Sequence, residues 1–119
     1  MGYLAIDSMV RGQASGGVRM LPDITSSEMA ALAKVMTLKY GFLGIPRGGA
    51  KAGIIADPSL PQEKRRALLK AFAESIRPFL NSRRFLPGPD MGTNAEDIAF
   101  MMEAIGLRRR PGPGRGDSG

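Results

Sequence analysis

A repeated helix-start signal behind short apolar segments is the feature of this sequence that most constrains its fold. Ser or Thr followed three positions later by Glu or Gln forms a capping box, whose side chains satisfy backbone N–H groups at a helix start. The signal occurs at Thr25/Glu28, Ser59/Gln62 and Thr93/Glu96. Apolar residues at helical spacing follow each pair, so the sequence predicts three amphipathic helices.

The first helix is predicted to begin at Ser26 and to end at Gly41. Its inward stripe is Met29, Leu32, Ala33, Met36 and Tyr40. At 100° per residue, Lys34 falls on the opposite face and Lys39 on the flank of the stripe. We therefore expect Lys34 to be solvated and Lys39 to be partly buried.

The other two helices have equally clear apolar faces. The second has its inward residues at Leu68, Leu69, Phe72, Ala73, Ile76 and Leu80, and its exposed face at Lys64, Arg65, Arg66 and Glu74. Pro78 is expected at the end of this helix, because proline lacks the N–H that a helix interior needs. The third runs through Ile98, Met101, Met102 and Ile105, and Gly106 stops it.

Short apolar segments between these helices predict strands. They cover 3–10, 18–20, 42–45, 52–56 and 85–89, with loops at 12–17 and 46–50. Strands that alternate with amphipathic helices are typical of an α/β domain, so we predict a mixed sheet with helices packed on it.

Length and composition fit one domain and exclude several chemistries. We assign residues 1–107 to the domain and 108–119 to a disordered tail, because Arg, Pro and Gly cannot build a core. The 119 residues include no cysteine and no histidine. Disulfides, thiolate or histidine metal sites and Ser-His triads are therefore excluded, and acid–base work falls to Lys, Asp, Glu or Tyr.

The net charge of +6 is divided evenly, since the 12-residue tail carries half of it. The body lacks a basic stripe with interleaved aromatic residues, so we expect no nucleic-acid partner. No apolar run approaches the ~20 residues that span a bilayer. We expect a soluble, cytoplasmic protein.

Three segments combine residues that can do chemistry. Lys39 lies near a helix end, Lys51 follows Gly48 and Gly49, and Asp90 comes shortly before a predicted helix start. Burial and nearby charge can lower a lysine pKa from about 10.4 towards 6, which makes lysine a usable base. Taken singly, each has a structural explanation: a solvated lysine, a tight turn and a capping carboxylate. A phosphate loop is excluded, because Ala50 separates Gly49 from Lys51 and Ala52 follows.

Four motifs in one order resemble the Glu/Leu/Phe/Val family of amino-acid dehydrogenases. They are GGVRM (16–20), MTLK (36–39), GGAKAGI (48–54) and PDMGT (89–93). The resemblance covers residues 3–107 and the family's N-terminal substrate-binding and dimerisation domain. It implies an α/β fold, a homo-oligomer, and reversible NAD- or NADP-dependent oxidative deamination of an L-amino acid to a 2-oxo acid and ammonia.

The same resemblance assigns roles to individual residues. Lys39 would hold the substrate α-carboxylate, Lys51 would be the catalytic lysine that activates water, and Asp90 would shuttle protons. The substrate pocket would also include Ser15 and the glycine pairs Gly16–Gly17 and Gly48–Gly49. Glutamate-specific members commonly have a lysine where this chain has Ser15. Ser15 therefore predicts a substrate other than glutamate, as in the leucine branch, unless Arg47 meets an acidic side chain.

Two functions remain open at this point. The resemblance ends before the family's Rossmann domain, which would bind NAD or NADP, so we expect the chain alone to be inactive as a dehydrogenase. The first hypothesis is the catalytic domain of an amino-acid dehydrogenase. The alternative is a non-catalytic amino-acid-binding or dimerisation module.

Overall fold

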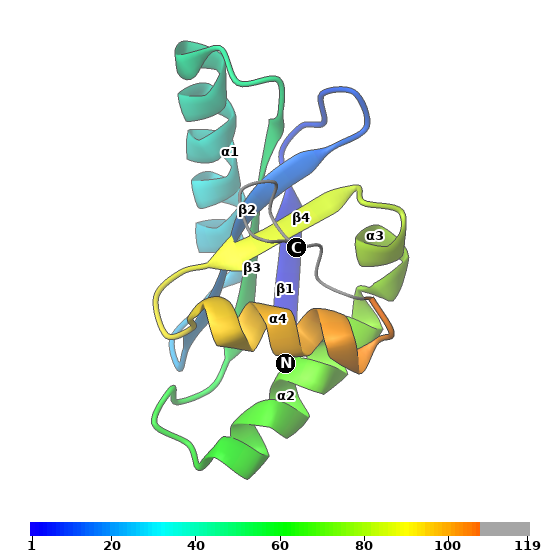
Figure 1. Ribbon diagram of the computed structural model, residues 1–119. Helices are drawn as coiled ribbons and strands as arrows, with labels where there is room; N and C mark the ends of the chain where they lie inside the picture. The colour runs from blue at the N-terminus through cyan, green and yellow to red at the C-terminus, as the bar shows by residue number, and fades with distance from the viewer. Residues whose placement is uncertain (108–119) are drawn as a thin grey trace.

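A four-stranded mixed sheet organises residues 1–107, which are the residues that this computed structural model describes (Figure 1). Its strands are β1 (Gly2–Ile6), β2 (Ala14–Leu21), β3 (Gly48–Ile55) and β4 (Phe85–Pro89). They lie in the order β1-β3-β2-β4, with β1 antiparallel to β3 and the other neighbours parallel. The predicted α/β class with a mixed sheet is confirmed. The predicted disordered tail, residues 108–119, lies outside the described residues.

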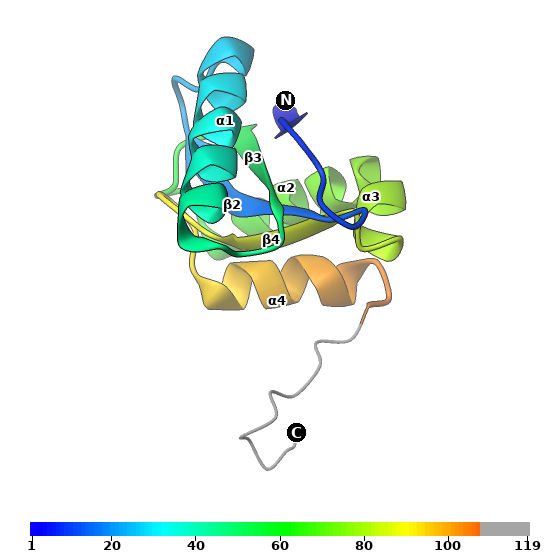
Figure 2. The same ribbon diagram turned by 90° about the horizontal axis from the view of Figure 1, so that it is seen from above.

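Helices cover both faces of this sheet. They are α1 (Ser26–Leu43), α2 (Gln62–Ser75), α3 (Arg77–Asn81) and α4 (Ala95–Ala104). Figure 2 shows α1 on one side of the sheet and α4 on the other. Helix α2 packs against α4, and α1 lies mainly over β3 and β1. The face of β2 and β4 beside α1 is therefore the part of the sheet that α1 leaves open.

Alternation along the two central strands separates a core face from a polar face. The core between the sheet and α2 and α4 includes Ala14, Val18, Met20, Ala50, Ala52, Ile54, Leu69, Phe72, Phe85 and Met101. The strand residues of this group are even-numbered in β2 and β3, as the two-residue period of a strand requires. The odd-numbered residues, including Ser15, Arg19 and Lys51, therefore lie on the α1 side.

The sheet departs from the predicted strand pattern at glycines. Strand β2 begins at Ala14, so Gly16 and Gly17 are in a strand and not in a loop. A side chain on Gly16 would place its Cβ 1.7 Å from the Ala50 carbonyl oxygen. Glycine therefore marks close backbone packing here, and turn propensity was misleading.

The segment between α1 and β3 also differs from the prediction. Helix α1 continues past Gly41 to Leu43 and ends at Gly44, whose φ of 72° is left-handed. The predicted strand 42–45 is therefore wrong, and β3 begins at Gly48 within the predicted loop 46–50. The first strand is shorter than predicted, since β1 ends at Ile6.

Of the three predicted capping boxes, only the Thr25 half of the first is formed. The Thr25 hydroxyl accepts a hydrogen bond from the Glu28 N–H at the start of α1. Helix α2 begins after Pro61 with no side-chain cap, and Pro78 lies in the first turn of the separate helix α3. The capping box of α4 is formed by Asn94 and Asp97, one residue beyond the predicted pair.

Candidate functional site

Lys51, Asp90 and Arg19 form a charged cluster on the polar face of the sheet. The Lys51 ammonium lies 2.7 Å from Asp90 Oδ2, and Arg19 Nε donates to the same oxygen at 2.8 Å. The side chains are 8%, 21% and 14% exposed, respectively. The structure therefore brings the two predicted catalytic residues into direct contact, and Lys51 is buried.

The parallel strands place these residues together. Val18 is opposite Ala52 of β3 and Pro89 of β4. Arg19, Lys51 and Asp90 are each adjacent in sequence to one of these three residues, so they lie near the same level of the sheet. Asp90 follows the last residue of β4, and its backbone is fixed by Thr93. The Thr93 hydroxyl accepts from the Asp90 N–H at 3.0 Å and donates to the Val18 carbonyl at 2.7 Å.

Two opposing effects set the pKa of Asp90. Burial raises the pKa of this carboxyl group, but the contacts with the Lys51 and Arg19 cations outweigh burial and hold it below its usual value. Asp90 is therefore a carboxylate at neutral pH, able to accept hydrogen bonds from a cationic or N–H-bearing ligand.

Gly17 and Ser15 line β2 beside the cluster. A Cβ on Gly17 would lie 2.6 Å from Asp90 Cβ, so glycine leaves the space that Asp90 occupies. The buried Ser15 donates its hydroxyl to the Tyr40 hydroxyl of α1 at 2.7 Å. Ser15 thus joins the sheet to α1 next to the charged cluster.

The second glycine pair fixes the sheet against other elements. A Cβ on Gly49 would lie 2.2 Å from both the Ala33 oxygen and the Thr37 nitrogen of α1, and the Gly49 N–H donates to the Thr37 hydroxyl at 2.9 Å. A Cβ on Gly48 would lie 1.9 Å from the Ser8 carbonyl oxygen. These glycines position β3 and therefore Lys51, which comes directly after Ala50.

Lys39 does not meet the expectation of partial burial, because its side chain is exposed, as is Lys34. Within residues 1–107 Lys39 makes no ion pair. Thr37 contacts β3 and Tyr40 contacts β2. At 100° per residue, Lys39 lies about 100° from Tyr40 on the side away from Thr37. Lys39 therefore lies on the β2 side of α1, with its side chain exposed.

Sequence reasoning missed Arg19, Tyr40 and Thr93 as members of the site. Arg19 and Thr93 fall within two of the recognised motifs, so their place in the motifs was the available signal. Tyr40 was assigned only to the apolar stripe of α1. Arg65 was predicted on an exposed face, but its side chain is 11% exposed and pairs with the buried Asp97.

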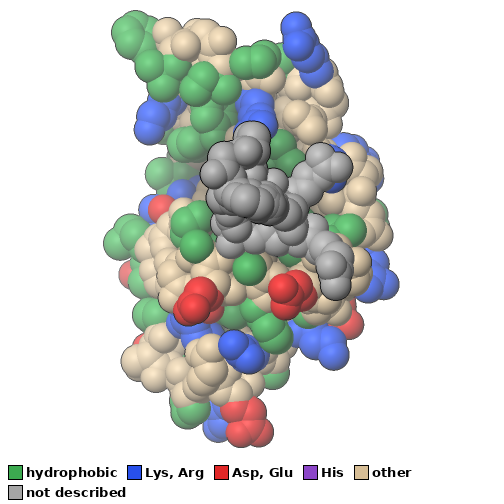
Figure 3. All heavy atoms as spheres, in the orientation of Figure 1, with side chains coloured by type: hydrophobic (Ala, Val, Ile, Leu, Met, Phe, Trp, Pro, Cys, Tyr) green, Lys and Arg blue, Asp and Glu red, His purple; other side chains and the backbone are tan. Residues whose placement is uncertain are grey.

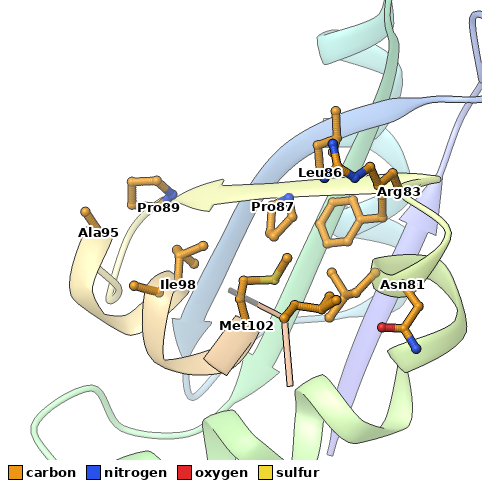
Figure 4. A pocket seen from close by; sticks show the side chains of 12 residues that line it. Asn81, Arg83, Leu86, Pro87, Pro89, Ala95, Ile98 and Met102 are labelled. Atoms are coloured by element: carbon orange, nitrogen blue, oxygen red, sulfur yellow. The ribbon is translucent and has the colours of Figure 1, made fainter. Parts of the chain in front are cut away.

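An apolar groove lies on the other side of the sheet. It has a volume of about 370 Å³ between β4, α3 and α4, and its lining includes Phe85, Pro87, Ile98 and Met102 (Figure 4). Neither Lys51 nor Asp90 lines it, although Pro89 does. The groove is lined mainly by apolar side chains, in contrast to the charged cluster on the other face.

The described part of the chain presents no metal centre. No group of three or more Asp, Glu, His or Cys residues within it is arranged to hold a metal ion. Among its helices, none combines the length and apolar character needed to cross a membrane.

Comparison with known proteins gives one consistent likeness. Residues 1–106 match the family model described as Glu/Leu/Phe/Val dehydrogenase, dimerisation domain. The NAD-specific glutamate dehydrogenase A of Halobacterium salinarum is 38% identical over 109 residues, which are 90% of this chain and 25% of that protein. The chain thus spans about a quarter of the length of the curated relatives it matches.

Solved structures agree with that likeness. The hetero-hexameric glutamate dehydrogenase of Thermus thermophilus superposes with a TM-score of 0.82 at 32% identity, over 89% of this chain and 27% of that one. The L-tryptophan dehydrogenase of Nostoc punctiforme superposes with a TM-score of 0.73 at 31% identity, over 87% and 31%. Both likenesses cover the sheet and helices that carry Lys51 and Asp90.

Proposed function

The chain belongs to the Glu/Leu/Phe/Val dehydrogenase family, and from that premise we propose that it is the substrate-binding and dimerisation domain of an amino-acid dehydrogenase. Residues 1–107 would form this domain. The reaction is the reversible oxidative deamination of an L-amino acid to a 2-oxo acid and ammonia. The 2.7 Å contact between Lys51 and Asp90 is the observation that carries the proposal. A cytoplasmic location is part of the proposal.

The residues divide the work by charge and position. Lys39, on the flank of α1, would hold the α-carboxylate of the substrate, because an exposed ammonium on a flexible stem can reach an anion. Lys51 would activate the water that attacks the reacting carbon. Asp90 would accept hydrogen bonds from the substrate amine and exchange protons with Lys51, which lies within proton-transfer distance.

The cofactor is proposed to be NAD, because relatives of this chain are named NAD-specific. When bound, its nicotinamide would accept the hydride from the substrate carbon. The described residues do not fit a dinucleotide: no G-x-G-x-x-G turn joins a strand to a helix among them. We therefore assign no cofactor contact to residues 1–107.

Ligand binding tests this function without requiring hydride transfer. NMR titration of the 119-residue chain with L-amino acids and 2-oxo acids is expected to shift signals around Lys39, Lys51 and Asp90. Lys51→Ala is expected to weaken binding at least about tenfold, because it removes a buried charge. Lys64→Ala, an exposed change on α2, is the matched control. Equal binding by the two variants, or shifts away from the cluster, would contradict the proposal.

We further propose that the preferred substrate has a side chain without negative charge. Ser15 brings no cation, and its hydroxyl is engaged with Tyr40. The curated relatives are glutamate dehydrogenases, which favours glutamate, whereas one structural neighbour is an L-tryptophan dehydrogenase. A binding panel of leucine, phenylalanine and glutamate decides the matter, and glutamate as the tightest ligand would refute it. In that case Arg47, which is exposed before β3, is the first cation to replace.

A second candidate is a non-catalytic amino-acid-binding or dimerisation module, and it would share one surface for self-association with the enzyme domain. Val35, Leu38 and Phe42 of α1 are 56%, 64% and 90% exposed and share one helix face by their spacing. Figure 3 shows hydrophobic side chains gathered over the C-terminal end of α1. Exposed apolar patches of this kind mark interaction sites. Since the matched family domain is described as a dimerisation domain, we propose a second copy of the chain as the partner.

Sedimentation of the 119-residue chain tests this interface. Phe42→Ser is expected to weaken self-association at least about tenfold, because it removes the most exposed aromatic side chain of the surface. Met91→Ser, at an exposed apolar residue outside α1, is the control. Self-association that survives Phe42→Ser would exclude this surface. If Lys51→Ala leaves both self-association and amino-acid binding unchanged, the non-catalytic module replaces the enzyme domain.

A further inference from the structure

Arg19 and Lys51 contact the same carboxylate oxygen, Asp90 Oδ2. From this arrangement we infer that Arg19 is a positioning residue, which holds the Asp90 carboxylate against Lys51. Its consequence for catalysis rests on the proposed function. The contact with Asp90 is independent of that function, and it can be tested separately.

Arg19 belongs to β2 and contacts both Asp90 and Glu28. It rises from β2, donates from Nε to Asp90 at 2.8 Å, and lies with Nη1 3.8 Å from the Glu28 carboxylate of α1. The side chain is 14% exposed. Arginine side chains in proteins stay positively charged. The attraction between Arg19 and the Asp90 carboxylate therefore does not require Arg19 to gain or lose a proton.

Positive charge predominates around Asp90. Lys51 approaches from β3 and Arg19 from β2, while Glu28 of α1 acts only through Arg19 and is 47% exposed. Solvent screens an exposed carboxylate, so Glu28 offsets little of the positive charge. The buried Lys51 and the largely buried Arg19 together favour the ionised form of Asp90, in line with its lowered pKa.

The two carboxylate oxygens of Asp90 differ in their contacts. Both cations meet Oδ2, and among residues 1–107 no hydrogen bond to Oδ1 is formed. Oδ1 is therefore the oxygen that can accept from a substrate amine while Oδ2 stays with Lys51. Without Arg19, the carboxylate would lose the second contact that fixes this orientation.

Titration of the Asp90 carboxyl carbon by NMR tests the inference on the 119-residue chain. In Arg19→Met the pKa of Asp90 is expected to rise by about one unit or more, because an adjacent arginine lowers an aspartate pKa by roughly 1–3 units. Arg19→Lys, which retains the charge, is expected to restore part of the difference. Arg66→Met on α2 removes the same charge elsewhere and is expected to leave Asp90 unchanged.

The outcomes are decisive for Arg19 and separable from the proposed function. An unchanged Asp90 titration in folded Arg19→Met would overturn the inference, as would an equal shift in Arg66→Met. If Arg19→Met does not fold, Arg19→Gln removes the charge while retaining length and a donor, and the same criteria apply. A failure of the wild-type chain to bind any amino acid or 2-oxo acid would refute the function, whereas the Asp90 titration would still decide the role of Arg19.

Discussion

Two largely buried arginine–aspartate pairs hold the loop between β4 and α4 from opposite faces of the sheet. Arg19 meets Asp90 on the polar face, and Arg65 meets Asp97 on the core face. Arg65 also donates to the carbonyl oxygens of Pro58 and Gly92. The loop that contains Asp90 is thus fixed by charged side chains from β2 and α2.

Removing one member of the buried Arg65–Asp97 pair is expected to be costly. Asp97→Ala should lower the free energy of unfolding by about 3–5 kcal/mol, since it leaves a buried guanidinium without its carboxylate. Chemical denaturation measures the loss, and Glu103→Ala, at an exposed residue of α4, provides the baseline. The double variant Arg65→Met/Asp97→Leu should lose less than Asp97→Ala. A loss below about 1 kcal/mol for Asp97→Ala, as at an exposed pair, would show that the pair is unimportant.

At the scale of elements, the packing of α1 on β3 depends on Gly49. The helix backbone approaches Gly49 so closely that Ala33 and Thr37 occupy the space of a side chain. Local sequence could not reveal this approach, because a glycine pair is equally typical of a turn. The same ambiguity misplaced the end of α1 at Gly41, where nothing lies within 4 Å of the position that a Cβ would take.

The two glycines therefore predict opposite effects of the same substitution. Gly49→Ala is expected to destabilise the chain by about 1–3 kcal/mol, because the added methyl group forces α1 away from the sheet. Gly41→Ala is expected to stabilise it by about 0.5–1 kcal/mol, since alanine is preferred inside a helix and has room there. Thermal unfolding of the two variants compares them directly. Equal shifts in the same direction would refute this account of the α1–β3 contact.

For the whole molecule, the charged cluster links stability to pH. The pKa of Asp90 is lower in the folded chain than its ordinary value, so its contribution to stability is full above the unfolded pKa of about 3.9. That contribution is lost as the pH falls through the lower, folded pKa. The cluster joins β2, β3 and the segment after β4. Protonation of Asp90 is therefore expected to weaken the contacts among all three.

An acid titration of stability checks this linkage. The unfolding free energy of the wild-type chain is expected to exceed that of Asp90→Asn at pH 7, and the difference should shrink as the pH falls below about 4. Asp23→Asn, at an exposed turn residue, is the control and should show a much smaller difference. A wild-type advantage over Asp90→Asn that stays constant into strong acid would contradict the role of the carboxylate.

The sequence by itself determined the alternation of helices and strands, the α/β class, and Lys51 and Asp90 as the residues to examine. These features depend on short-range patterns: apolar periodicity, the Thr25 cap, and motifs of a few residues. The tertiary structure alone decided which residues meet Asp90, because Arg19 is 71 positions away from it along the chain. It also decided that Gly16–Gly17 belong to a strand, that Lys39 is exposed and that Arg65 is largely shielded by its pair with Asp97. In each of these cases the environment comes from elements remote in sequence, and local propensity contains no information about them.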